Sequence, residues 1–195
     1  MSISTYSELQ TAVATWLNRT DLTSVIPDFV ALAGSDIRSD VSVQAMEALV
    51  SGTLTGETLA HPARLTQARR LVVAGYPLDY VTPESYQDLQ RAQSTARVFT
   101  SIGQSLYILN GTSGDAYSLL YRAAFAPFSA GSDTNWLLAN APDVYLFAAC
   151  KQGAIYLKDA QDEARFAGHY SAAVARLNGQ EKRAGYAGAL QVRPA

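Results

Sequence analysis

The sequence predicts an α+β fold, in which helices from both ends of the chain form a bundle and a small antiparallel β-sheet is inserted between them. Apolar residues recur at helical spacing in the first 40 residues and again after residue 142, whereas residues 48–126 are rich in strand and turn signals. Helices, then strands, then helices is the order typical of an α+β domain. We therefore expect a single domain with four segments. These are 1–45 (N-terminal helices), 48–126 (β-rich insert), 134–183 (C-terminal helices) and 184–195 (an extended C-terminal tail).

The first segment predicts two helices separated by a polar break at 18–23. Thr5 and Glu8 form a capping-box pattern, in which the hydroxyl and the carboxylate each satisfy a free backbone N–H at the helix start. Pro27 suits the first turn of the second helix, because the N–H that proline lacks would have no partner there. The expected buried faces are Tyr6, Leu9, Val13 and Trp16/Leu17 on the first helix, and Phe29, Leu32/Ala33, Ile37 and Val41 on the second.

The β-rich insert predicts several strands and one short helix. The clearest signal is a hairpin over 98–109, where Gly103 can adopt the positive φ of a type II′ turn. Thr82 and Pro83 mark the start of the short helix, as cap and first residue. Further strands are expected at 49–55, 65–73, 77–81 and 117–125.

The C-terminal helices follow an unusual aromatic stretch. Trp136 is expected in a short turn before a helix that begins at Pro142, and Asp143 places a carboxylate in the first turn, where the helix dipole favours it. We expect Trp136 to pack in a joint between the sheet and these helices, while Pro142 and Asp143 set the direction of the helix at 142–158. Asp159 caps a final helix. Its expected inward residues are Phe166, Tyr170, Ala173/Val174 and Leu177.

Composition favours a protein that works in an assembly. Only 16% of residues are charged and 11 are tyrosine, and interface cores are depleted of charge and enriched in aromatic residues. A compact monomer with an uncharged polar surface is the alternative. A net charge of −2 argues against a basic nucleic-acid-binding surface. We expect no signal peptide and no membrane span, and the single Cys150 gives no internal disulfide.

No set of residues predicts a catalytic, cofactor or metal site. His61 and His169 are far apart in sequence and lack the additional ligands that a metal requires. Paired carboxylates among Asp159, Asp162 and Glu163 could support glycoside hydrolysis, but acidic residues at the start of a helix are explained more simply by capping and the helix dipole.

Two features point to partners instead. Arg69 and Arg70 form the only basic pair in the middle of the chain, and could meet a phosphate or a carboxylate of a partner, although a solvated strand face is the simpler interpretation. After Gly185, apolar residues alternate with smaller or polar ones, as in an arm that adds to a neighbour; a disordered terminus is the alternative. The candidate interaction residues of this arm are Tyr186, Leu190, Val192 and Arg193.

Several stretches, in order along the chain, carry a family resemblance. The most specific is Thr134-Asn135-Trp136-Leu137-Leu138 followed by Ala141-Pro142-Asp143-Val144-Tyr145-Leu146-Phe147. Weaker ones lie at 15–22, 26–33, 76–84, 99–109, 117–125 and 154–159. Together they make the chain resemble the head-to-tail adaptor (connector) proteins of tailed bacteriophages, which form a ring beneath the portal.

The resemblance implies a structural virion protein with no enzyme activity and no cofactor. It implies a homo-oligomeric ring, typically of twelve copies, that binds the portal protein above and tail, nozzle or neck proteins below. The subunit would be made in the host cytoplasm and would end at the head–tail interface of the virion. Viral DNA would pass through the bore without sequence-specific binding, and no membrane would be involved.

Two alternative functions stay open on the sequence. One is a virion-associated peptidoglycan hydrolase that uses Asp159, Asp162 or Glu163. The other is a different neck component, such as a stopper or tail-completion protein, which would contact the adaptor instead of the portal.

Overall fold

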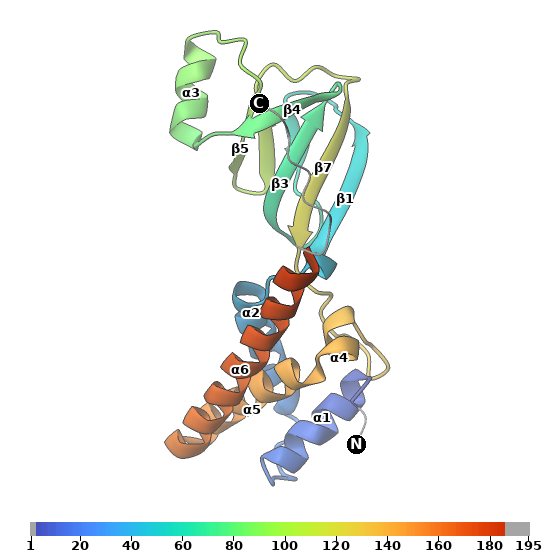
Figure 1. Ribbon diagram of the computed structural model, residues 1–195, viewed down its shortest axis with the longest axis vertical. Helices are drawn as coiled ribbons and strands as arrows, with labels where there is room; N and C mark the ends of the chain where they lie inside the picture. The colour runs from blue at the N-terminus through green and yellow to red at the C-terminus, as the bar shows by residue number, and fades with distance from the viewer. Residues whose placement is uncertain (1–2, 186–195) are drawn as a thin grey trace. The chain divides into compact units, whose positions relative to one another are not determined.

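The computed structural model describes residues 3–185, with side chains up to residue 180, and confirms the α+β class (Figure 1). The chain divides into two compact units. Of the described residues, the helical unit contains 3–45 and 125–185, and the β unit contains 46–124.

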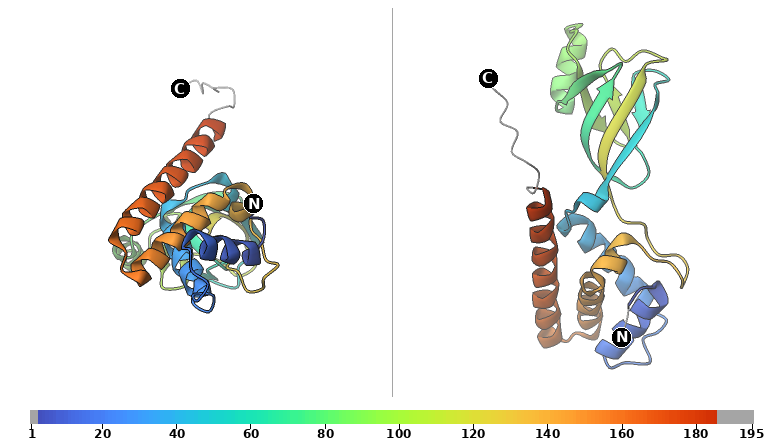
Figure 2. Two further views of the ribbon diagram at one scale, coloured as in Figure 1. Left: turned by 90° about the horizontal axis from the view of Figure 1, so that it is seen from below. Right: turned by 45° about the vertical axis from the view of Figure 1, so that its right-hand side comes forward.

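The helical unit is built around α5 (Pro142–Leu157), which α1 (Tyr6–Trp16), α2 (Ile26–Asp40), α4 (Trp136–Asn140) and α6 (Ala160–Gly185) all contact (Figure 2). Small residues on α5 allow this close packing. A Cβ placed on Gly153 would lie 2.5 Å from Leu17 Cδ1. Two non-bonded carbon atoms do not approach this closely, so the Leu17 side chain would have to move. The other small buried residues on α5 are Ala148, Ala149, Cys150 and Ala154.

The helix starts follow their local sequence signals. The predicted capping box is confirmed, since the Glu8 N–H donates to Thr5 Oγ1 and the Thr5 N–H donates to the Glu8 carboxylate. The predicted start of α5 at Pro142 is also confirmed, and α2 begins at Ile26 with Pro27 in its first turn, one residue before the predicted start. Asp159 accepts hydrogen bonds from the N–H groups of Gln161 and Asp162, as a cap of α6 should.

Two residues assigned to buried stripes are in fact exposed. Trp16 is 48% exposed, although its ring contacts Phe147 edge-on at 5.5 Å, and Leu32 is 54% exposed. The sequence offered Trp16 or Leu17 on α1 and Leu32 or Ala33 on α2. The second residue of each pair is the less exposed one, since Leu17 is partly buried and Ala33 is fully buried.

Polar contacts tie the helices of this unit to one another. Lys151 Nζ on α5 lies 2.6 Å from Asp36 Oδ2 on α2, in a partly buried ion pair. The Tyr170 hydroxyl on α6 donates to Asp40 at 3.0 Å, and both burial and this carboxylate raise the pKa of the phenol. Asn178 Nδ2 on α6 donates to the backbone carbonyl of Asp40 at 2.9 Å. The pairing of α2 with α5 and α6 is therefore specified by charge as well as by apolar packing.

The β unit contains a seven-stranded sheet in the order β1-β7-β3-β4-β5-β6-β2. Its strands are β1 (Glu47–Thr53), β2 (Thr58–Ala60), β3 (Leu65–Val73), β4 (Tyr76–Tyr80), β5 (Val98–Ile102), β6 (Ser105–Ile108) and β7 (Ala116–Ala123). The sheet is not purely antiparallel, as the sequence led us to expect, because β4 and β5 pair in parallel. The chain between them passes through α3 (Pro83–Arg91), which gives the long connection that a parallel pair requires.

Other differences in detail are local. The predicted hairpin is confirmed as β5 and β6, with Gly103 at φ +62°. The strand β2 and the helix α4 were not predicted, since both are very short. In α4 the side chain of Asn135 accepts from the Leu138 N–H, so a cap and one helical turn stand where we expected a simple turn.

β3 keeps an apolar inner face despite irregular spacing. Leu65, Ala68 and Leu71 are three residues apart, whereas a regular strand returns to the same face every two. The pairing with β7 shifts between Leu65 and Gln67 and again between Ala68 and Arg70. Each shift is a β-bulge that adds one residue to β3 without a partner on β7, and the added residue accounts for the spacing of three. The consequence is that two consecutive residues face outward at each bulge.

One apolar cluster fills the inner side of the sheet. Its fully buried members are Leu71, Leu106 and Leu119, with Phe99 and Ile108 at 3% and 1% exposure. A smaller cluster joins Tyr86 of α3 to Val98 and Leu109, which places α3 on the other side of β5. The β unit thus has an internal core of its own.

Candidate functional site

The side chains that could carry chemistry are held in structural contacts. His61 Nε2 lies 3.1 Å from the Ser101 hydroxyl, but no carboxylate within the described residues bonds the other ring nitrogen. His169 stacks on Phe147 with ring centroids 5.0 Å apart. Burial raises the pKa of the Cys150 thiol to about 12, so this cysteine carries no thiolate at neutral pH. None of the three has the base or orienting group that a nucleophile requires.

Two of the three acidic residues considered for hydrolysis have structural roles. Asp159 caps α6, and Asp162 lies 3.2 Å from Arg165 one turn further along. Glu163 forms no ion pair with a described residue.

The structure offers no metal cluster and no membrane helix in the part of the chain that it describes. Among the side chains described, those of residues 3–180, no group of three or more His, Cys, Asp or Glu residues is placed to hold an ion. None of the described helices combines the length and the apolar character needed to span a bilayer.

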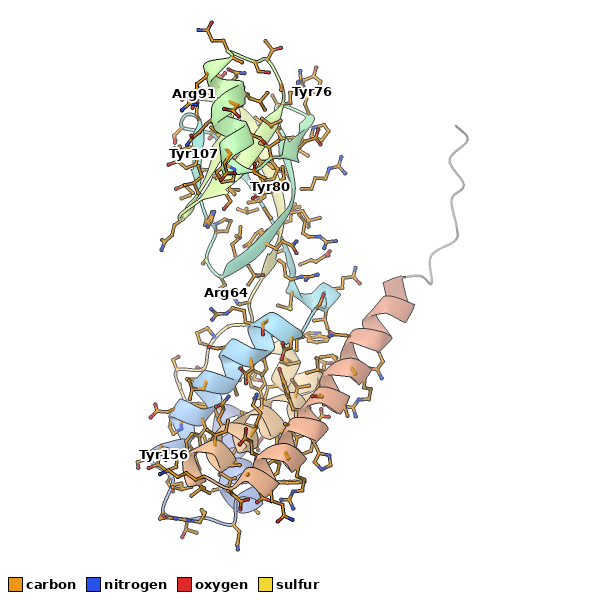
Figure 3. The ribbon with its side chains drawn as sticks, turned by 90° about the vertical axis from the view of Figure 1, so that its left-hand side faces the viewer. Arg64, Tyr76, Tyr80, Arg91, Tyr107 and Tyr156 are labelled. Atoms are coloured by element: carbon orange, nitrogen blue, oxygen red, sulfur yellow. The ribbon has the colours of Figure 1, made fainter. Side chains whose placement is uncertain are left out.

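The β unit has a surface pocket of about 390 Å³ at the end of the sheet where β3 turns into β4. Its floor is apolar, and its charged residues are Arg97 and Asp115. The Arg97 guanidinium lies 3.3 Å from the centroid of the Tyr76 ring, while the Asp115 carboxylate accepts from the Thr112 N–H and closes a turn. Tyr76 and Tyr80 both belong to β4 and are more than half exposed (Figure 3). The pocket therefore has binding groups without a catalytic pair.

The three predicted joint residues all lie in the helical unit. Trp136 begins α4, is 37% exposed and stacks on Phe125 with the two rings inclined by only 6°. Pro142 occupies the first turn of α5. Asp143 accepts from Arg176 of α6 at 2.6 Å, so its carboxylate links two helices as well as lying at a helix start. The predicted arm residues Tyr186, Leu190, Val192 and Arg193 lie outside the described residues.

On the side of the sheet away from the main apolar cluster, α3 packs on β5, and β1, β7 and β3 lie beyond it. Cross-strand partners of β1, β7 and β3 form three rows on this face, which we name the outer sheet face. The rows are Glu47–Arg122–Gln67, Leu49–Leu120–Arg70 and Ser51–Ser118–Val72. Leu49, at 68%, is the most exposed of the large apolar residues that the structure describes. The sequence did not reveal this face, because the bulges that turn Arg69 and Arg70 outward together depend on the pairing with β7.

These observations define a class of protein that works through its surfaces. Among the described residues, Cys150 is buried, His169 is stacked on Phe147 and Asp159 caps α6, while the outer sheet face carries exposed leucine and arginine side chains. The chain belongs to the SU10 adaptor protein family, whose model matches residues 4–193. The predicted resemblance to bacteriophage adaptor proteins is thereby confirmed, and no curated protein matches the chain.

Family membership supports a structural virion component that interacts with other head and tail proteins of a bacteriophage. It also argues against an enzyme, in agreement with the positions of the acidic residues.

Proposed function

We propose that this protein is a head-to-tail connector subunit that forms a ring below the portal and joins it to the tail. The observation that carries the proposal is the family match over almost the entire chain, from residue 4 to residue 193. A ring of twelve copies is proposed, with tail, nozzle or neck proteins bound on the side away from the portal. Viral DNA passes through the bore without sequence-specific contacts. The two-unit architecture supports this role, because each unit has its own core and can offer a separate surface to a partner.

Binding to purified portal rings tests this function directly. The protein is mixed with intact portal rings, and the mixture is sedimented and imaged by electron microscopy. We expect a stoichiometric complex with added density on one face of the portal. Absence of binding to intact rings would contradict the proposal, and binding only to a preformed portal–adaptor complex would assign the chain to another neck component. A monomer in isolation is compatible with the proposal if the portal serves as the template.

The segment 186–195 is proposed as an arm that contacts the portal or a neighbouring subunit through Tyr186, Leu190, Val192 and Arg193. Alternating apolar residues can add a strand to an exposed sheet edge. Deletion of 186–195 should weaken binding to the portal rings and leave the circular dichroism spectrum almost unchanged. Equal affinity of the truncated and full-length proteins would remove the arm from the proposal.

A further inference from the structure

The outer sheet face has the arrangement of a protein-binding surface. Leu49, Leu120 and Val72 lie on this face, one on each of its three strands. Leu49 pairs directly with Leu120, and Val72 pairs with Ser118, so Val72 is a diagonal neighbour of Leu120. Figure 1 shows β1, β7 and β3 side by side, and the helix of this unit, α3, packs against β5. An exposed apolar group bordered by polar residues is the usual anatomy of an interface, with an apolar centre and a polar rim.

The rim of this face is cationic. The bulge after Ala68 turns both Arg69 and Arg70 outward, and the structure gives neither side chain an ion pair. Arg122 is on the same face, and its Nε is buried without a hydrogen-bond partner. The acidic residue in the rows of this face is Glu47, which is the cross-strand neighbour of Arg122. Arginine is enriched in interfaces because its planar group binds carboxylates through two donors, so the partner of this face is expected to be acidic.

The helical unit of the same chain has a surface of complementary character. Leu32 on α2 and Ile155 and Tyr156 at the end of α5 are 54%, 45% and 57% exposed. The Tyr156 ring packs on Phe29 of α2 at 5.4 Å, and Phe29 and Leu32 are neighbours on one helix, so α2 and α5 contribute to one apolar region. Tyr156 projects from the outside of this unit (Figure 3).

Carboxylates border this helical surface. Asp28 lies one turn before Leu32 on α2 and has no basic partner within the described residues. Asp159 follows three residues after Tyr156, and Glu163 lies one turn further into α6; neither forms an ion pair with a described residue. The basic residues near these three acids are Lys158, which lies between Tyr156 and Asp159, and Arg19, which interacts with Tyr156 but is paired with Asp21 at 2.6 Å. The surface is therefore apolar at its centre and acidic at its edge.

We propose that the outer sheet face of one subunit docks on the α2–α5 surface of a second copy of this chain. The arginine rim and the acidic border are complementary in charge, and the exposed leucines would be removed from water together. Two different surfaces that meet in this way form a heterologous contact, which closes into a ring when its rotation closes. The contact rests on the proposed function, since it supplies the lateral interface that a connector ring requires.

Cysteine cross-linking, carried out on the free protein and on the portal-bound protein, tests the contact. Leu49→Cys and Leu32→Cys both change exposed positions, and the native Cys150 is buried with its pKa raised to about 12, so a flexible bis-maleimide should react almost only at the new thiols. The double variant should give a ladder of dimers, trimers and larger multiples on a denaturing gel. An equal mixture of the two single variants should give cross-linked dimers but no larger multiples, because each chain then carries only one new thiol.

Charge exchange is the second arm of the test. Arg69→Glu with Arg70→Glu should reduce the cross-linked fraction by roughly tenfold or more, because like charges then face each other across the interface. Adding Asp28→Lys should recover part of it. Arg91→Glu is the control, since Arg91 is also exposed in the same unit but lies on α3, beside Asp88, and should leave the ladder intact.

Portal binding and the cross-linking ladder are measured separately, so that failure of the lateral contact can be distinguished from failure of the connector function. A complex that fills the portal ring without any ladder would overturn the lateral contact and leave the connector function in place. A cross-link confined to single chains of the double variant would also overturn it. A ladder in free protein that does not bind portal rings would support the contact and contradict the connector function.

Discussion

The helical unit and the β unit use their charged residues in different ways. In the helical unit, charged side chains link one helix to another, as in Lys151–Asp36 and Arg176–Asp143 at 2.6 Å. Within residues 46–124, all of which the structure describes, the one ion pair is Arg91–Asp88 at 3.8 Å, on the surface of α3. All six basic residues in that range are arginine. The comparison indicates that ion pairs help to specify the packing of the helical unit, whereas the β unit uses Arg64 and Arg97 in other internal contacts and has no ion pair at Arg69 or Arg70 among the described residues.

The largest expected effect tests whether the two cores are independent. Phe166 in α6 and Leu119 in β7 are both 0% exposed. Phe166→Ala should destabilise the helical unit by about 3–5 kcal/mol, and Leu119→Ala should destabilise the β unit by about 2–5 kcal/mol. Hydrogen exchange followed by mass spectrometry should show lost protection only in the unit that carries the substitution.

The control for this comparison is Leu49→Ala, which should change stability by less than about 0.5 kcal/mol because Leu49 is exposed. Equal loss of protection in both units after either core substitution would mean that the chain unfolds as one cooperative body, and the division into two units would then have no thermodynamic meaning.

The next effect concerns the point where the chain returns to the helical unit after β7. Trp136 is 37% exposed and stacks on Phe125, so Trp136→Ala should lower the free energy of unfolding by about 1–2 kcal/mol, less than the ~3–5 kcal/mol of a fully buried ring. Chemical denaturation measures the change. Full stability of this variant together with weaker portal binding would assign Trp136 to a partner surface instead of the proposed joint.

The sequence predicts the helical unit better than it predicts the β unit. The helix starts at Thr5, Pro27 and Pro142 were predictable because a cap or a proline acts within a few residues of its own position. The bulges at Leu65–Gln67 and Ala68–Arg70 were not, because register is set by a partner strand more than 40 residues away. The same holds for the parallel pairing of β4 with β5.

The candidate site was predictable only in part, for a related reason. The absence of a catalytic pattern and the family resemblance both come from residue types and local order, which the sequence contains directly. The outer sheet face instead depends on Leu49, Leu120 and Arg70 becoming cross-strand neighbours, although they are distant in sequence. Arg69 and Arg70 were recognised as a pair, but the simplest interpretation was a solvated strand, since the exposed leucine beside them was not visible from the sequence.

A smaller effect distinguishes close helix packing from open helix surface within the helical unit. Gly168 on α6 has open space around an added Cβ, so Gly168→Ala should stabilise by about 0.5–1 kcal/mol, the usual gain of alanine over glycine in a helix. Gly153→Ala should show none of this gain, because the new methyl group would meet Leu17 at 2.5 Å and displace it. Leu17→Ala should restore the gain at residue 153, and thermal unfolding of the four variants measures this coupling. An equal gain at 153 and 168 would show that α5 is not closely packed there.

The smallest effect concerns acid sensitivity, which we expect to arise in the helical unit. The Asp133 carboxylate accepts from the N–H groups of Ser129 and Ala130 and from the Ser129 hydroxyl, and these bonds hold its pKa below the usual value near 4. The loop that it closes is fastened to the start of α1, where Tyr6 and Ser7 donate backbone N–H bonds to the carbonyls of Asp133 and Gly131.

Because the folded pKa of Asp133 is lowered, its contribution to stability is present above the unfolded value near 4 and is lost as the pH falls through the folded value. Asp133→Asn should therefore lower the melting temperature slightly at pH 7 and flatten its decline below pH 4, as measured by circular dichroism. Asp115→Asn is the control in the β unit, since Asp115 closes its turn through one longer bond of 3.3 Å. If Asp115→Asn flattened the acid decline as much as Asp133→Asn does, acid sensitivity would not separate the two units.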